Sequence, residues 1–402
     1  MKVAMIGWEF PPFIAGGLGV HSLELTAGLA RSGVDIDFYM PRMETGEDQP
    51  QPGSHHDHVE INEVAAAPAE SPYAGTGGSQ TSEGAGYGDD FNQAVDRYND
   101  RVVDAFDAHD ADLLHCHDWI TVPGALEIRR RTGLPLVFTV HSTEYDRSAG
   151  LDPQHWIETI ERRGVHEAER VIAVSEYTKQ LVEDRYDADP DTVVAIHNGV
   201  DLARWDQPPE PRTEQTAGTV LFLSRLVRQK GPLFFLEAAE RVLEQAPQAR
   251  FVVTGKGSML RECLEHTIDR GIADRVHFTG FVPEEELAEV YQASDVYVLP
   301  SVSEPFGITV LEAMASGVPT IVSKTSGVGE ALDHVLTVDF WDTDELADLI
   351  LGVLDHEPLR SEMRTRGGEE VRQFSWDDTC RETLSVYEDL LQETPTVEVT
   401  AR

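Results

Sequence analysis

Residues 295–319 read DVYVLPSVSEPFGITVLEAMASGVP, and this stretch decides the fold that the rest of the chain is expected to share. Residues 295–299 are apolar and β-branched, which predicts a short buried strand. Residues 300–305 predict a turn, and from Gly307 the apolar residues recur at helical spacing until Gly317 and Pro319 end the helix. A buried strand, a turn and a helix in this order indicate an α/β fold.

The start of this predicted helix is a candidate anion site. The first N–H groups of a helix have no partner within it, so the amides of Gly307, Ile308 and Thr309, with the helix dipole, favour a phosphate. Glu304 precedes the helix, and Glu312 follows about two turns later. Carboxylates beside a phosphate site are unusual unless they bind hydroxyl groups, which a sugar on one side and a ribose on the other would supply.

The composition is strongly acidic. The 402 residues include 72 acidic and 32 basic residues, which gives a formal net charge of −40, and five of the basic residues are lysines. Such a surface repels nucleic acid and anionic membranes, so neither is an expected partner. Because molar salt would screen the self-repulsion, we expect a protein from a halophile's cytoplasm. The length predicts two or three domains.

The cysteines and the first residues also indicate a cytoplasmic protein. Cys116, Cys263 and Cys380 are odd in number and far apart, which favours a reducing compartment without a disulfide framework. No apolar run has the length of a membrane span, so no transmembrane segment is expected. Residues 1–6 lead directly into Trp8 and Glu9, which predicts a first strand and not a signal peptide.

The first half of the chain has the pattern of a Rossmann-like domain, predicted for residues 1–206. A strand at residues 2–6 precedes Gly16 and Gly17, and a helix is predicted from about residue 20 to residue 31. Glycines in such a turn let the backbone approach a ligand closely. Residues 43–90 are rich in Gly, Ser, Pro and acidic residues, and predict a flexible insertion with one strand at 59–64.

Two strand ends in this half carry histidines. Residues 113–117 predict a strand that ends in His115 and His117 before Asp118, and residues 136–140 predict a strand that delivers His141. Ligands bind at the carboxyl ends of strands in open parallel sheets, so His141 is a candidate site residue. A helix over about 152–169 follows.

A polar, proline-rich segment after residue 206 predicts the domain boundary. A second Rossmann-like domain is predicted for residues 215–375. A last helix is predicted from about 376 to 391, long enough to cross back to the first domain before a tail that ends at residue 402. The strand at 219–223 precedes Arg225, Arg228 and Lys230, a cluster of positive charge that suits a diphosphate.

The whole pattern resembles the GT-B glycosyltransferases, in particular family 4 and the neighbouring bacterial-type glycogen and starch synthases. The resemblance covers nearly all of the chain except about residues 43–90. Its strongest part is the pair Glu304 and Glu312 with the upstream Arg225 and Lys230. The matching stretches are PPFIAGGLG at 11–19, HCHDWIT at 115–121, TVHSTEYDR at 139–147, IHNGVD at 196–201, SRLVRQKG at 224–231 and EPFG at 304–307.

The resemblance implies two Rossmann-like domains facing a central cleft and retaining transfer of a hexosyl unit, expected to be glucosyl. The donor would be an ADP-, UDP- or GDP-sugar, the acceptor a glycan such as an α-glucan, and no metal or cofactor would be needed. Arg225 and Lys230 would neutralise the departing diphosphate. Glu304 would hold the sugar hydroxyls, and Glu312 would bind the ribose.

The same resemblance assigns positions to the remaining candidates. His141 would sit beside the donor sugar, Gly16 and Gly17 would approach the phosphates from the first domain, and Asp118 would line the cleft. Glycogen and starch synthases carry a lysine where this chain has Ala15. We therefore expect donor or acceptor handling to differ.

Four alternatives stay open at this point. A family 4 transferase could use another donor, such as GDP-mannose, on a lipid or glycan. A metal-dependent hydrolase could use His115 and His117. A non-catalytic subunit could bind a sugar nucleotide, and a pyridoxal phosphate phosphorylase could use Lys256 or Lys324. A histidine tract at residues 55–58 could also bind a metal ion.

Overall fold

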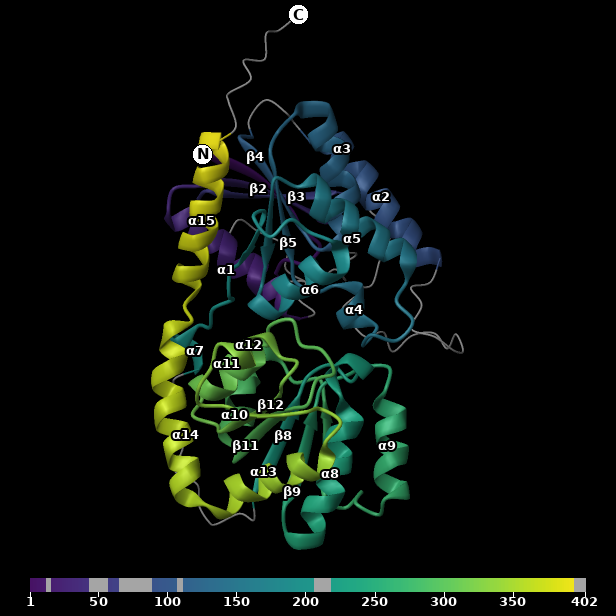
Figure 1. Ribbon diagram of the computed structural model, residues 1–402, viewed down its shortest axis with the longest axis vertical. Helices are drawn as coiled ribbons and strands as arrows, with labels where there is room; N and C mark the ends of the chain where they lie inside the picture. Colours follow the sequence, from purple (N-terminus) through teal and green to yellow (C-terminus); the bar gives the residue numbers. More distant parts are fainter. Residues whose placement is uncertain (12–15, 43–56, 65–88, 107–110, 206–217, 394–402) are drawn as a thin grey trace, which may run out of the picture.

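The computed structural model describes residues 1–11, 16–42, 57–64, 89–106, 111–205 and 218–393. Figure 1 shows two lobes along the long axis of the molecule, each built on one parallel sheet with helices around it. We call the part built on the sheet of residues 2–195 the first lobe, and the part built on the sheet of residues 219–338 the second lobe. The fold is GT-B, as the resemblance implied.

The first lobe alternates strands and helices along the chain. Its strands are β1 Lys2–Ile6, β2 Asp35–Pro41, β3 Val59–Val64, β4 Leu113–His117, β5 Leu136–Val140, β6 Arg170–Ala173 and β7 Val193–Ala195. Its helices are α1 Gly17–Arg31, α2 Asp89–Ala105, α3 Val122–Thr132, α4 Glu144–Arg147, α5 His155–Glu167, α6 Glu176–Tyr186 and α7 Leu202–Trp205, with a 3-10 turn at Trp119–Thr121.

The second lobe repeats this alternation. Its strands are β8 Thr219–Leu223, β9 Arg250–Thr254, β10 Val276–Gly280, β11 Val296–Leu299, β12 Thr320–Ser323 and β13 Leu336–Val338. Its helices are α8 Pro232–Gln245, α9 Leu260–Asp269, α10 Leu287–Gln292, α11 Ile308–Ala315, α12 Gly327–Glu330, α13 Thr343–Asp355 and α14 Glu357–Glu370. The helix α15 Trp376–Glu393 follows.

Both sheets are parallel and have the same kind of strand order. The orders are β3-β2-β1-β4-β5-β6-β7 and β10-β9-β8-β11-β12-β13. The first strand of each sheet therefore lies between its second and fourth strands, so the order reverses beside β1 and beside β8. Ligands of open parallel sheets bind at the carboxyl ends of the strands at such a reversal. The loops after β1, β4, β8 and β11 are therefore the expected binding loops.

The buried strands explain why the sequence pattern was readable. Every residue of β4, β5, β11 and β12 is buried, because helices cover both faces of each sheet. Such strands appear in the sequence as short continuous apolar runs. The opening stretch is confirmed, since β11 and α11 fall inside the predicted strand and helix.

The last helix returns to the first lobe. Figure 1 shows α14 along the second lobe and α15 continuing along the same side of the molecule beside α1. Cys380 of α15 packs against Gly28 of α1, and the hydroxyl of Tyr387 lies 2.5 Å from Nδ1 of His115 in β4. The end of the chain therefore packs on the first lobe, and the predicted limits of the domains stay a prediction.

The chain crosses between the lobes at two places that bond to each other. The amide of Val200 donates to the carbonyl of Phe374, and the hydroxyl of Thr379 donates to the carbonyl of His197. A Cβ on Gly199 would lie 2.2 Å from the backbone nitrogen of Trp376, so only glycine fits where the crossings meet. The two crossings are therefore packed directly against each other.

Two predicted helix starts were displaced. α1 begins at Gly17, before the predicted residue 20, because Gly16 already has the extended backbone of an N-cap. The helix predicted from residue 152 begins at His155, because Asp152 has a left-handed backbone with φ of 53° and Pro153 follows it. Strand β3 lies where the sequence predicted it, whereas most of the predicted insertion, residues 43–56 and 65–88, and Ala15 lie outside the described residues.

None of the helices in the described part of the chain combines the length and apolar character needed to cross a bilayer.

Candidate active site

Lys230 and Glu304 form a buried ion pair at the centre of the candidate site. Lys230 follows β8 and Glu304 follows β11, the two strands beside the reversal of the second sheet. The Nζ of Lys230 lies 2.6 Å from Oε2 of Glu304, and the two side chains are 12% and 7% exposed. Ser301 donates a second bond to the same oxygen at 3.1 Å. Residues 74 positions apart therefore act as one unit.

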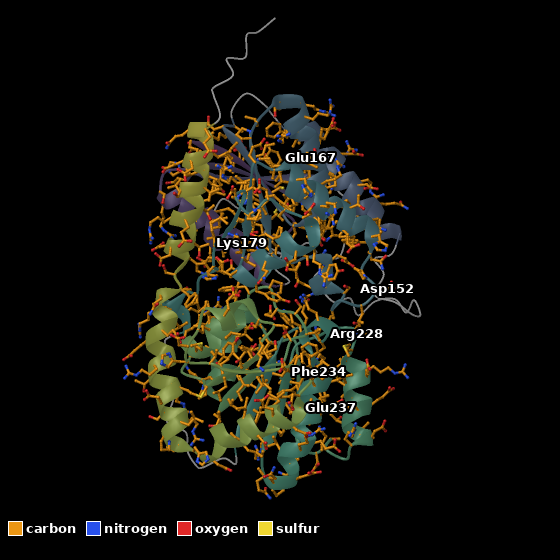
Figure 2. The ribbon with its side chains drawn as sticks, viewed as in Figure 1. Asp152, Glu167, Lys179, Arg228, Phe234 and Glu237 are labelled. Atoms are coloured by element: carbon orange, nitrogen blue, oxygen red, sulfur yellow. The ribbon has the colours of Figure 1, made fainter. Side chains whose placement is uncertain are left out.

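Burial lowers the pKa of Lys230, while the carboxylate of Glu304 opposes this shift. The guanidinium of Arg225 also lowers the pKa of Lys230, which places the two cations in each other's field. Arg225 lies 3.5 Å from the side-chain oxygen of Gln229. Figure 2 labels Arg228 of the same loop where the second lobe faces the first, above Phe234 and Glu237 of α8. The predicted cation cluster thus lies on the side of the second lobe that faces the first lobe, after β8, where ligands of open parallel sheets bind.

The helix α11 begins directly beside this pair. Gly307 is its N-cap, with φ of 109°, and a Cβ there would lie 3.3 Å from Cγ of Glu304. The hydroxyl of Tyr297 donates to the side-chain oxygen of Thr309 at 2.8 Å, and the backbone amide of Thr309 lies in the first turn of the helix. The structure therefore combines a helix N-terminus and two cations at one place.

Gly17 approaches this helix from the other lobe. A Cβ on Gly17 would lie 3.4 Å from Cδ1 of Ile308, and Gly17 is exposed at the start of α1. A Cβ on Gly16 would meet nothing within 4 Å. The glycine turn of the first lobe is therefore brought to the N-terminus of α11, and the open space at Gly16 adjoins it. Both glycines are where a phosphate group held by α11 could meet the backbone of the first lobe.

Direct bonds between the lobes lie next to Glu304. The carbonyl of Pro305 accepts bonds from the hydroxyls of Ser175 and Thr178 at 2.5 Å and 3.1 Å. The hydroxyl of Tyr177 lies 2.9 Å from that of Ser303, which also binds the carboxyl of Asp146. These bonds place the start of α6 and the loop after β5 against residues 303–305.

His141 and Asp118 lie together at the ends of β5 and β4. The backbone amides of His141 and Ser142 donate to Oδ1 of Asp118 at 2.7 Å and 3.2 Å. Asp118 has a left-handed backbone with φ of 58°, and its side chain is buried. Asp118 therefore positions the loop that carries His141, and its predicted place in the lining of the cleft stays a prediction. Nε2 of His141 lies 3.0 Å from Nδ1 of His117.

Glu312 lies farther along α11 and contacts α10. The hydroxyl of Tyr291 donates to its Oε2 at 2.9 Å. Burial raises the pKa of Glu312 to about 7, although the bond from Tyr291 opposes this shift. The two carboxylates predicted to flank a ligand therefore differ, because Glu304 is held by a lysine and Glu312 by a neutral phenol.

An aromatic candidate that the sequence analysis missed lies at the end of β10. Phe281 is 64% exposed, and Nζ of Lys256 lies 5.5 Å from the centre of its ring. An exposed aromatic ring at the carboxyl end of a strand can stack on a flat ring such as a nucleobase. A single phenylalanine after a strand carries no signal in the sequence that would separate this position from a core residue.

One lysine and one histidine on which the phosphorylase and hydrolase alternatives depend already have partners within the protein. Lys324 pairs with Asp339 at 2.9 Å on the surface. Both ring nitrogens of His115 are engaged, Nδ1 by Tyr387 and Nε2 by Thr139 at 2.7 Å. A metal site made of His115 and His117 would break one of the two hydrogen bonds of the buried His115. The hydrolase built on that pair is therefore not supported.

Residues 203–370 match the family described as glycosyl transferases group 1, and residues 15–204 match Glycosyltransferase Family 4. An uncharacterised glycosyltransferase of Methanocaldococcus jannaschii is 31% identical to this chain over 406 residues, covering 96% of this chain and 98% of that one. The chain belongs to the group 1 glycosyltransferases. It is therefore a transferase, as predicted.

Other relatives are similar over the same length. A glycogen synthase of Mycobacterium tuberculosis is 28% identical, covering 96% of this chain and 94% of the relative. A D-inositol 3-phosphate glycosyltransferase of Corynebacterium diphtheriae is 30% identical, covering 97% and 95%. The solved sucrose-phosphate synthase of Thermosynechococcus elongatus has a TM-score of 0.76 at 20% identity, covering 98% of this chain and all of that chain. That structure shares the fold of this transferase.

Proposed function

We propose that this transferase moves a glucosyl unit from an ADP-, UDP- or GDP-glucose to an α-glucan, with retention of the anomeric configuration. The observation that carries the proposal is the buried pair of Lys230 and Glu304 at the first turn of α11. A cation, a carboxylate and free helix amides at one place fit a sugar attached to a diphosphate. The name of the mycobacterial relative, glycogen synthase, supports an α-glucan as the acceptor.

The diphosphate gains charge as its bond to the sugar breaks. Lys230, Arg225 and the amides at the start of α11 are fixed donors for that charge, and such preorganised donors stabilise a transition state without reorganising. Lys230 is held by Glu304 before the donor binds, so its position is set in advance. Because two side chains supply positive charge beside the helix, the proposed reaction needs no metal ion.

The remaining residues take roles that follow from their positions. Glu304 would accept bonds from sugar hydroxyls while it orients Lys230, and His141 would contact the same sugar from the first lobe. Glu312 would bind the ribose, and Phe281 would stack on the base. Gly16 and Gly17 leave space for the phosphates between the lobes.

The test is nucleotide release in molar KCl with ADP-, UDP- and GDP-glucose and GDP-mannose, each with a maltooligosaccharide or inositol phosphate as acceptor. We expect release with a glucosyl donor and the maltooligosaccharide, and α-configured product by proton NMR. Glu304→Gln should lower kcat/KM by about a hundredfold or more, the usual cost of one charge-stabilising group. Glu382→Gln, an exposed glutamate of α15, is the matched control and should leave the rate unchanged.

Three results would overturn parts of this proposal. No release with any donor and acceptor would overturn transfer to these acceptors. Preference for GDP-mannose or for inositol phosphate would overturn the proposed substrates. A β-configured product would overturn retention.

A further inference from the structure

Three histidines from separate elements point their rings at one another behind the candidate site. His21 is on α1, His117 ends β4 and His141 follows β5. One ring nitrogen of each lies within 4.8 Å of those of the other two. The ring centres of His21 and His141 are 4.4 Å apart. Three strands and helices that are distant in sequence thus converge on one cluster of imidazoles.

The hydrogen bonds around this cluster leave two buried ring nitrogens without a partner, while Nδ1 of His117 and Nε2 of His141, 3.0 Å apart, share one proton that a bound metal ion would displace. Nδ1 of His21 lies 2.7 Å from the side-chain oxygen of Asn198, which can only accept, so this nitrogen carries the proton. Nε2 of His21 then bears a lone pair. In the described part of the chain, Nε2 of His21 and Nε2 of His117 are both buried and have no hydrogen-bond partner. His21 is 4% exposed and His117 is 0% exposed. Two unpartnered buried nitrogens cost free energy unless something binds them.

The arrangement has the features of a metal site with imidazole ligands. A histidine that binds a metal usually donates its other ring N–H to an oxygen, as His21 does to Asn198. Zinc at about 2.0–2.1 Å from each nitrogen requires ligand nitrogens roughly 3.4 Å apart, so ring nitrogens that now lie up to 4.8 Å apart would move together when the ion binds. The fourth position would stay open, because three ligands do not complete a tetrahedron.

The three rings of the cluster are held in their neutral form. Burial lowers the pKa of His21 to about 4, and the pKa values of His117 and His141 are also lowered by burial and by the neighbouring histidines. Neutral rings are suitable ligands, since only the proton shared by His117 and His141 has to move before the ion binds. The buried carboxylate of Asp118 lies next to His117 in the chain, and the net charge of −40 draws cations to the whole surface.

We propose that His21, His117 and His141 bind one borderline divalent transition metal ion, such as Zn²⁺ or Co²⁺, and that its binding inhibits transfer. The inhibition rests on the proposed function, in which His141 contacts the donor sugar. A bound ion would hold the ring of His141 and prevent that contact. Hard cations such as Mg²⁺ would not bind, since they prefer oxygen ligands.

The test is a Co²⁺ titration of the metal-free protein, followed by visible absorption, with the histidine tract of residues 55–58 removed by His55→Gln, His56→Gln and His58→Gln. We expect one ion per chain with the strong absorption of tetrahedral cobalt, displacement by Zn²⁺ and none by Mg²⁺. Asn198→Ala should weaken binding by about 10–100-fold, the usual effect of losing such a partner. His21→Gln should weaken it at least as much.

His115→Gln is the matched control, because His115 is buried beside the cluster but both its nitrogens are engaged elsewhere, and it should keep Co²⁺ binding. Circular dichroism and thermal unfolding check that each variant folds. Absence of tetrahedral cobalt in the parent protein would overturn the site. Equal binding by the parent and a folded His21→Gln variant would do the same.

The inhibition is read separately from the binding. Zn²⁺ should inhibit nucleotide release by the parent at concentrations where it displaces Co²⁺, and the activity left in His21→Gln should need at least about tenfold more Zn²⁺. Binding without inhibition would overturn the inhibitory role. If no transfer is found at all, the cobalt spectrum still decides the metal site, so the two proposals fail independently.

Discussion

Lys230 and Glu304 show how much of the site depends on single residues. Each would be costly to bury alone, because a desolvated charge without a partner is strongly unfavourable. Their contact at 2.6 Å removes most of that cost, and Ser301 satisfies a further lone pair of the carboxylate. The pair therefore fixes the direction of both side chains before any substrate arrives.

A double-mutant cycle tests this dependence. Lys230→Met and Glu304→Gln alone should each lower the free energy of unfolding, and Lys230→Met, which strands a buried carboxylate, by about 3–5 kcal/mol. The double variant should lose clearly less than the sum of the two, because no unpaired charge remains. Urea unfolding of the four proteins at high salt measures this coupling. Strictly additive losses would show that the two side chains do not depend on each other.

At the residue scale, the sequence was sufficient to select candidate site residues, but it did not show which residues they contact. Glu304, Lys230 and Gly307 could be singled out because they stand at strand ends and at a helix start. His21 could not, because a histidine in an amphipathic helix carries no mark of its neighbours. His21 contacts His117 and His141 only because α1 packs beside the ends of β4 and β5.

At the scale of elements, the helices α1 and α15 lie far apart in the sequence but contact each other in the fold. α15 is the last element of the described chain, yet it packs beside α1. Gly28 makes this contact possible, since a Cβ there would lie 2.1 Å from Sγ and 3.0 Å from Cβ of Cys380. The contact ties the end of the chain to the element that carries the glycine turn.

Gly28→Ala should therefore destabilise the protein by about 1–3 kcal/mol, the usual cost of an overpacked core position. Gly352→Ala is the matched control on α13, where an added Cβ would meet no atom within 4 Å, and it should stabilise by up to about 1 kcal/mol through helix propensity. Thermal unfolding at fixed salt compares the two. Adding Cys380→Ala to Gly28→Ala should recover part of the loss, and a loss unchanged by this second substitution would contradict the steric explanation.

At the scale of the whole molecule, the large negative charge is expected to lower the stability of the folded state. With a net charge of −40 on 402 residues, the folded state holds like charges closer together than the unfolded chain does. Screening lengths shrink from about 10 Å at 0.1 M salt to about 3 Å at 1 M, so added salt should relieve this repulsion.

Raising KCl from 0.1 M to 3 M should increase the Tm by more than about 5 °C, which corresponds to a gain of roughly 2 kcal/mol for a domain of this size. Sucrose at matched osmolality is the control, because it is excluded from the surface without screening charge. A Tm that is flat or falls with KCl, or that rises as much with sucrose, would contradict the expected adaptation to salt.

The sequence by itself determined the βαβ alternation, the two sheets and the residue types at the strand ends. These are local properties: fully buried parallel strands must be short apolar runs, and a helix start beside a strand end must show glycine or a turn. They were sufficient to select Lys230, Glu304, His141 and the glycine turn as candidates.

Only the tertiary structure decided which of these residues touch. The strand order brings the loops after β8 and β11 together, the packing of the two lobes brings Gly17 to Ile308, and the packing of α1 gathers three histidines. The physical reason is that contacts between distant residues depend on how whole elements pack, and sequence periodicity reports only which face of an element is buried. The partners on that face are chosen by the other elements.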